Sequence, residues 1–258
     1  MRGSAGMDVT QALTDDGYRL NSTEYIREAN GIVQRDAQVI QFPIKSFVVQ
    51  EEEIDRRKIF LTMKRSFDLI ASTIALIMLS PVMLFIAIAI FLDDPKGSPI
   101  FSQTRVGKDG KEFKFYKFRS MCVNAEAILD QLQEKNEMDG PAFKMKDDPR
   151  ITKIGKFLRK TSLDELPQFV NIIKGDMSIV GPRPPLPREV EQYNAYHKQR
   201  LMVKGGLTCY WQCGGRSNVG FDEWVDMDIK YINQMSFKTD IKIILKTAKA
   251  VIKMDGAE

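Results

Sequence analysis

The sequence has few of the residues that build disulfide frameworks or metal centres. Its 258 residues include three cysteines and one histidine. Three cysteines give no even disulfide framework, and Cys209 and Cys213 lack the C-x2-C spacing and the nearby histidine of a zinc site. Residues 1–30 also lack the apolar core of a signal peptide. We therefore expect a reduced protein that faces the cytosol.

Composition indicates one globular unit with a short N-terminal extension. Hydrophobic residues make up 43% of the chain and charged residues 28%, and no internal repeat or low-complexity tract is present. Residues 1–60 carry 8 Lys and Arg against 10 Asp and Glu, whereas the rest carry 30 against 24. The positive excess therefore belongs to the body of the protein. Such an excess suits anionic lipid, phosphorylated small molecules or nucleic acid, and charge alone does not choose among them.

A long apolar run extends from Leu69 to Leu92 without a charged residue. About 20 apolar residues are enough to span a bilayer as a helix, so we expect this run to enter a membrane. Ser80 and Pro81 fall at its middle. Because proline removes a backbone donor and clashes with the preceding turn, this pair predicts a break or kink in the membrane helix.

Positive charge flanks the apolar run on both sides. Lys64 and Arg65 precede it, where we expect them to contact lipid headgroups, and a lysine-rich domain follows it. The positive-inside rule is better satisfied if both ends stay cytoplasmic. We therefore expect an N-terminal extension, partly disordered, over residues 1–60, a re-entrant membrane helix over residues 61–95 and a cytoplasmic domain over residues 96–258.

The rest of the chain predicts an α+β, mostly helical fold. Ile100–Gln103 and Glu112–Phe118 are short aromatic and β-branched runs around a glycine-containing turn, which indicates a small β-hairpin. Residues 125–136 read as a helix. In residues 241–254, and more briefly in 151–160, apolar residues recur at helical spacing between basic ones. Such helices either lie in the headgroup plane or pack on the core with a solvated lysine face, and both interpretations remain open.

The adjacent carboxylates Asp164 and Glu165 allow two interpretations. Thr161 or Ser162 could cap a helix, with Glu165 completing a capping box, and no catalysis would then be needed. Alternatively, one carboxylate is a nucleophile and its neighbour helps to bind a metal ion. Because consecutive helix residues diverge by about 100°, the two side chains would have different roles.

Three arginines could bind phosphate oxygens. Arg159, Arg183 and Arg216 carry the planar guanidinium groups that match phosphate geometry, and Arg183 lies in a proline-rich turn that would hold its direction. The alternative for each is an exposed surface residue.

Six short motifs follow one another along the chain. They are Lys64-Arg65-Ser66-Phe67-Asp68, Ser80-Pro81, Phe115-Tyr116-Lys117-Phe118-Arg119-Ser120-Met121, Ser162-Leu163-Asp164-Glu165-Leu166-Pro167-Gln168, Lys174-Gly175-Asp176-Met177-Ser178 and Gly181-Pro182-Arg183-Pro184. Together they closely resemble the bacterial sugar transferase family, the monotopic phosphoglycosyl transferases that initiate capsule, exopolysaccharide and glycoprotein glycan assembly. The resemblance covers residues 64 to about 254, in the family's order.

The resemblance implies a ping-pong mechanism. Asp164 would attack the β-phosphate of a UDP-sugar, UMP would leave, and the phosphosugar would pass to polyprenyl (undecaprenyl) phosphate. Asp164 and Glu165 would hold Mg²⁺. The residues implied to bind substrate are Arg159, Arg183, Arg216, Lys117 and Arg119. The same resemblance implies a monotopic protein on the cytoplasmic face of the bacterial inner membrane, with a helix kinked at Ser80-Pro81.

The chain departs from the family pattern where Gly205 replaces a proline and Cys209 a glycine. We expect these changes to affect the choice of sugar, for which galactose and glucose are the first candidates, rather than the reaction. The absence of further apolar helices in residues 1–60 predicts a short-form enzyme. A homodimer is compatible with the sequence, although no residue pattern requires it. A non-catalytic basic membrane-binding module is the main alternative, and no recognisable motif supports nucleic-acid binding.

Overall fold

The computed structural model describes residues 34–35, 38–39, 49, 51–132, 134, 136–137, 140–143, 145, 147–213 and 219–253. The predictions for residues 1–30 and for Arg216 lie outside these residues. The strands are β1 (Gln34–Arg35), β2 (Gln38–Val39), β3 (Ile100–Val106), β4 (Glu112–Phe118), β5 (Ser178–Val180) and β6 (Gly206–Thr208). The α-helices are α3 (Glu51–Arg56), α4 (Lys58–Asp93), α5 (Ala125–Leu132), α6 (Lys153–Lys160), α7 (Gln168–Lys174), α8 (Pro187–Val190), α9 (Ala195–Lys198), α10 (Tyr210–Cys213), α11 (Phe221–Gln234) and α12 (Phe237–Lys253). Short 3-10 turns are η1 (Lys108–Gly110), η3 (Leu163–Glu165) and η4 (Gln199–Met202).

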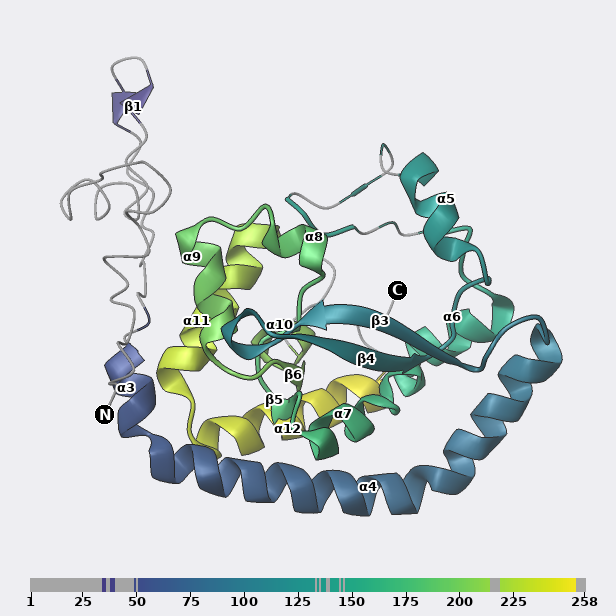
Figure 1. Cartoon of the computed structure of the whole chain (residues 1–258), viewed down its shortest axis with the longest axis horizontal. Helices are drawn as coiled ribbons and strands as arrows, with labels where there is room; N and C mark the ends of the chain where they lie inside the picture. The colour runs from purple at the N-terminus through teal and green to yellow at the C-terminus, as the bar shows by residue number, and fades with distance from the viewer. Residues whose placement is uncertain are drawn as a thin grey trace, which may run out of the picture.

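The apolar run forms the middle of α4, a helix of 36 residues that continues through Pro81. In Figure 1, α4 runs along the base of the molecule and then turns upward. Proline has no amide proton for the carbonyl four residues earlier, which is Ile77 here. The Ser80 hydroxyl donates to that carbonyl at 2.8 Å. The expected kink is therefore present as a bend in a continuous helix, and the serine compensates for the donor that the proline lacks.

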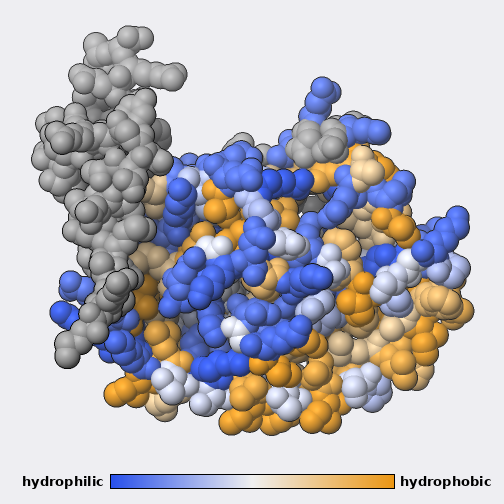
Figure 2. Space-filling model, viewed as in Figure 1, coloured by the Kyte–Doolittle hydropathy of each residue, from blue (hydrophilic) through white to orange (hydrophobic). Residues whose placement is uncertain are grey.

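The outer surface of α4 is apolar and exposed. Only 11% of its most apolar 18-residue window is buried. The large exposed side chains include Ile77 at 68%, Phe85 at 74% and Leu92 at 76%. Figure 2 shows the resulting hydrophobic band along the lower edge of the molecule, where α4 lies. A core helix would be mostly buried, so this helix is instead suited, by length and composition, to a membrane.

Both arms of α4 contact the same protein body. In the first arm, Lys64 Nζ lies 2.5 Å from Asp240 of α12 and the Arg65 guanidinium donates to the carbonyls of Ile172 and Ile173, near the end of α7. In the second arm, Ile90 packs in the core cluster of α6. Lys64 and Arg65 therefore hold α4 to the body, and headgroup contact by either residue stays an untested prediction.

The predicted hairpin is confirmed. Strands β3 and β4 pair antiparallel from Ile100 opposite Phe118 to Val106 opposite Glu112, so β3 is longer than expected. The turn between them contains Asp109 with a φ of 58°, a left-handed conformation that aspartate tolerates. Strands β5 and β6 form a separate, parallel pair, and β1 and β2 pair antiparallel. The helix expected over residues 125–136 ends at Leu132 as α5. The α+β, mostly helical fold is confirmed.

The largest core cluster is formed mainly by α11 and its neighbours. Val225, Ile229 and Ile232 of α11 are almost fully buried, as is Ile243 of α12. The opposite side of α12 exposes Ile241, Leu245, Ala248 and Ile252, which recur at helical spacing between lysines. The core-packing interpretation of this amphipathic helix is therefore confirmed, whereas a location of its exposed apolar stripe in the headgroup plane stays a prediction.

Candidate active site

The two central carboxylates lie on a tight turn between α6 and α7. Asp164 and Glu165 belong to η3, and Ser162 before them has a φ of 56° and makes no side-chain cap. The predicted capping box is therefore wrong. Asp164 is only 5% exposed and lines a cavity of about 770 Å³. A buried carboxylate without a capping role must be explained by its other contacts.

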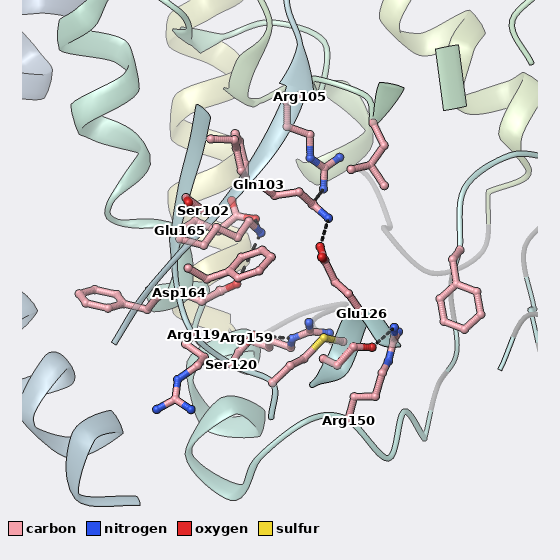
Figure 3. A pocket seen from close by; sticks show the side chains of 18 of the residues that line it. Ser102, Gln103, Arg105, Arg119, Ser120, Glu126, Arg150, Arg159, Asp164 and Glu165 are labelled. Carbon is pink, nitrogen blue, oxygen red and sulfur yellow. Dashed lines mark hydrogen bonds and ion pairs between the residues drawn. The ribbon is translucent and has the colours of Figure 1, made fainter. Parts of the chain in front are cut away.

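Lys117 of β4 connects the two carboxylates. Its ammonium lies 2.8 Å from an oxygen of Glu165 and 3.5 Å from an oxygen of Asp164. Figure 3 shows the two acidic side chains next to each other on one side of the cavity. The carboxylate oxygens of both residues thus converge on one cation. The sequence predicted side chains that diverge by about 100°, so the two carboxylates lie closer together than expected. Burial raises the pKa of Asp164, and Lys117 opposes that shift.

Arg159 reaches the cavity from the last turn of α6. This helix packs directly on the backbone of Ser120, because a Cβ at Gly155 would lie 1.9 Å from the Ser120 carbonyl oxygen. The close approach lets Arg159 Nε donate to Ser120 Oγ at 3.0 Å. Burial lowers the pKa of Arg159, whereas the charge of Asp164 acts in the opposite direction. The structure therefore brings Arg159 and Lys117 to Asp164, and substrate binding by either residue stays a prediction.

Arg183 and Arg119 occupy different positions. Arg183 is partly buried and lines the cavity. Arg119 also lines it, but its guanidinium lies 2.5 Å from the carboxylate of Asp94 and bonds to the carbonyl of Gly97. In Figure 3 its guanidinium points away from Asp164. Arg119 therefore fastens the end of α4 to β4.

Sequence reasoning missed Arg105, which supports the turn that holds Arg183. Arg105 is 7% exposed and donates to the Pro184 carbonyl at 3.0 Å, and the next backbone amide donates to the Pro185 carbonyl at 2.9 Å. Burial is the main cause that lowers the pKa of Arg105 to about 9, and the positive charge of Arg183 lowers it further. In the sequence Arg105 looks like an ordinary basic residue of a hairpin, so no pattern distinguished it from the other basic residues.

Two further polar groups that sequence reasoning missed line the cavity. Gln103 accepts from Arg105 at 3.1 Å and donates to Glu126 of α5 at 3.0 Å, a chain that Figure 3 shows across the cavity from Asp164. Asp148 and Arg150 form a buried ion pair at 2.6 Å. The cavity is therefore bordered by cations with a few acids among them, which suits a ligand that carries both phosphates and hydroxyl groups.

The departures from the family pattern do not line the cavity. Cys209 is fully buried, and burial beside Asp228 raises its pKa. A Cβ at Gly205 would lie 2.5 Å from Pro184 Cγ, so Gly205 permits close packing against the turn that carries Arg183. Both positions could act on a ligand only through their neighbours. Leu207, between them, does line the cavity.

The acidic pair suits Mg²⁺. Within the described residues, no group of three or more His, Cys, Asp or Glu side chains could hold a metal ion. Magnesium commonly uses one or two carboxylates together with substrate phosphates and water, so a complete protein cage is not needed. Asp164 and Glu165 already direct oxygens at one ammonium group. The donor set therefore fits a small hard cation.

Comparisons with known proteins identify relatives of this chain. Residues 59–254 match the family model described as bacterial sugar transferase. The chain is 52% identical over 199 residues to "Galactosyl transferase CpsE" of Streptococcus agalactiae, covering 77% of this chain and 44% of the relative. It is 44% identical to "Undecaprenyl-phosphate galactose phosphotransferase" of Salmonella typhimurium, covering 76% and 41%. It is 39% identical to "Exopolysaccharide production protein ExoY" of Sinorhizobium fredii, covering 82% and 95%.

The matched region contains nearly every element of the described structure, from α4 to α12. The chain spans less than half the length of the first two relatives and almost the whole length of the third. The buried Asp164 with its partner Glu165, the cations around them and the bent α4 all lie inside the match. This chain belongs to the bacterial sugar transferase family.

Proposed function

We propose that this protein transfers a sugar 1-phosphate from a UDP-sugar to undecaprenyl phosphate, the first membrane step of polysaccharide assembly. The observation that carries the proposal is the 5% exposed carboxylate of Asp164, which lines a cavity beside Lys117, Arg159 and Arg183. The names of two relatives mention galactose, so UDP-galactose is the first donor to test and UDP-glucose the second.

Asp164 is the proposed nucleophile. Its carboxylate oxygen forms a bond to the β-phosphorus while the bond from that phosphorus to the oxygen of the α-phosphate breaks, and UMP leaves with the electron pair. The phosphate oxygen of undecaprenyl phosphate then attacks the same phosphorus and releases Asp164. Burial raises the energy of the Asp164 carboxylate, which favours its attack.

The cations around Asp164 stabilise the charge that develops on the phosphoryl oxygens. Phosphoryl transfer depends mainly on positioning and electrostatics, and Arg159 and Arg183 line the cavity in a suitable position. Mg²⁺ held by Asp164 and Glu165 would neutralise phosphate charge when bound. Lys117 bridges the two carboxylates and keeps them together in the free protein.

The attachment of α4 supports a re-entrant arrangement. Its first arm is fastened through Lys64 to α12, and the residue after its end, Asp94, is fastened to Arg119 beside β4. A straight crossing would place these two ends on opposite sides of the bilayer, although both contact one body. The re-entrant helix and the exposed stripe of α12 would place the cavity at the cytoplasmic headgroup level of the bacterial inner membrane.

The test is UMP release by the purified protein in lipid nanoparticles with Mg²⁺, undecaprenyl phosphate and a panel of UDP-sugars. We expect UMP from wild type and from the control Asp109→Asn, whose side chain is exposed on the hairpin turn. Asp164→Asn should release none. If Asp164→Asn matches wild type, or if no donor gives UMP with folded protein, the non-catalytic membrane module becomes the better interpretation.

A further inference from the structure

Gln168 lines the same cavity as Asp164. It is the first residue of α7 and follows Asp164 by four positions. The backbone between the two residues forms successive hydrogen bonds from an amide to the carbonyl three residues earlier. Both residues line one cavity although the turn between them is of the 3-10 type. The side chain of Gln168 is 2% exposed, so its carboxamide is enclosed at the cavity wall rather than solvated.

The amide nitrogen of Gln168 has no hydrogen-bond partner in the described part of the chain. Buried polar groups almost always have one, and an unpaired donor destabilises the fold. On the next turn of α7, Asn171 shows the usual arrangement, because its amide donates to the Lys114 carbonyl at 2.6 Å and accepts from Tyr116 at 3.0 Å. Asn171 has a structural role, whereas Gln168 keeps a donor without an acceptor among the described residues.

A neutral donor is the side chain that suits this place. A lysine or arginine one turn from Asp164 would pair with its carboxylate and weaken the nucleophile. A carboxylate would repel an incoming phosphate. The carboxamide of Gln168 donates to phosphate oxygens without neutralising Asp164, and Lys117, Arg159 and Arg183 already supply positive charge to the cavity.

We propose that Gln168 Nε2 donates a hydrogen bond to a non-bridging oxygen of the phosphoryl group that Asp164 attacks. This rests on the proposed transferase function and assigns one further substrate-contacting residue to it. The phosphoryl group gains its bond to Asp164 as UMP departs, so the acceptor oxygen stays within reach of Gln168 in the covalent phosphosugar intermediate as well. The ligand supplies the acceptor that the fold does not.

The test compares Gln168→Met and Gln168→Glu with wild type in lipid nanoparticles. Methionine keeps the length and removes the donor, whereas glutamate keeps an acceptor and adds a charge that repels phosphate. The matched control is Gln192→Met, the same change at an exposed position. The measurements are kcat and KM for UMP release, the yield of covalent phosphosugar-protein by intact mass spectrometry, and the midpoint of thermal unfolding.

We expect Gln168→Met to lower kcat about 100-fold, as the loss of one charge-stabilising donor does elsewhere, with a smaller change in KM. Its unfolding midpoint should equal or exceed that of wild type, because a buried unpaired donor has been removed. Gln168→Glu should lose more activity than Gln168→Met, and Gln192→Met should behave as wild type.

Full activity in Gln168→Met would overturn the proposal, and so would a loss of activity that only parallels a lower unfolding midpoint. In both cases wild type still releases UMP, so the transferase function survives. If wild type itself forms neither UMP nor the covalent intermediate from any donor, the proposed function and the role of Gln168 fail together.

Discussion

Replacing Lys117 with methionine tests whether this residue holds the acidic pair together. The ammonium lies 2.8 Å from Glu165 and 3.5 Å from Asp164, and the Lys117 side chain is 20% exposed. A hydrogen bond to a charged group contributes about 1.5–3 kcal/mol, and two carboxylates would be left facing each other. We expect the free energy of unfolding to fall by about 2 kcal/mol. In a protein of this size that lowers the unfolding midpoint by about 4–8 °C.

The assay is thermal unfolding of Lys117→Met in lipid nanoparticles, with Lys108→Met as the matched control. Lys108 forms only a 4.0 Å contact with Asp109, and its side chain is 44% exposed, so its loss should cost less than about 1 kcal/mol. Adding Asp164→Asn to Lys117→Met should restore stability, because the repulsion is removed. Mg²⁺ should raise the midpoint of Lys117→Met more than that of wild type.

Two results would refute this reasoning about Lys117. One is an unchanged midpoint in Lys117→Met, which would mean that the ion pairs add nothing to stability. The other is simple additivity with Asp164→Asn, which would mean that the lysine and the carboxylate act independently.

Three further predictions concern pH, the support of Arg183 and topology. Because burial raises the pKa of Asp164, kcat should fall on acidification at a pH above the usual aspartate range. Over the same pH range, acidification should raise the free energy of unfolding, because the folded state binds the Asp164 proton more tightly than the unfolded state does. Calorimetry at a series of pH values measures this gain. Arg105→Lys should lower kcat/KM about tenfold with KM rising, because lysine cannot reproduce the planar donors that hold the Pro184 carbonyl, and steady-state kinetics would show it. Cysteines introduced at Asp55 and Lys96, on either side of α4, should be labelled from the same face of sealed vesicles; labelling from opposite faces would contradict the re-entrant arrangement.

Local signals in the sequence predicted local structure well. The hairpin of β3 and β4 was found because two aromatic and β-branched runs and the glycine-containing turn between them lie within one short segment. The bend of α4 was found because proline acts on its own turn. The prediction of a capping box was wrong because contacts between distant segments outweigh local preference there. Ser162 adopts a left-handed conformation, and the packing of α6 against Ser120 determines where η3 lies.

Roles that depend on distant partners could not be read from spacing. Lys117 and Arg119 belong to one motif, yet the first contacts Glu165 and the second contacts Asp94. Arg105 and Gln168 drew no notice individually, because a basic strand residue and a helix glutamine are ordinary until a cavity is known to lie beside them. The sequence therefore singled out the proposed nucleophile, whereas the contacts around it could be found only from the fold.

The contact of Arg119 with Asp94 connects the end of α4 to the strand that carries Lys117. Lys117 lies in β4, and Arg119 follows the end of that strand, two positions further along the chain. One contacts the acidic pair and the other contacts the end of the bent helix. A displacement of the upper arm of α4 would therefore act on the chain two residues from Lys117.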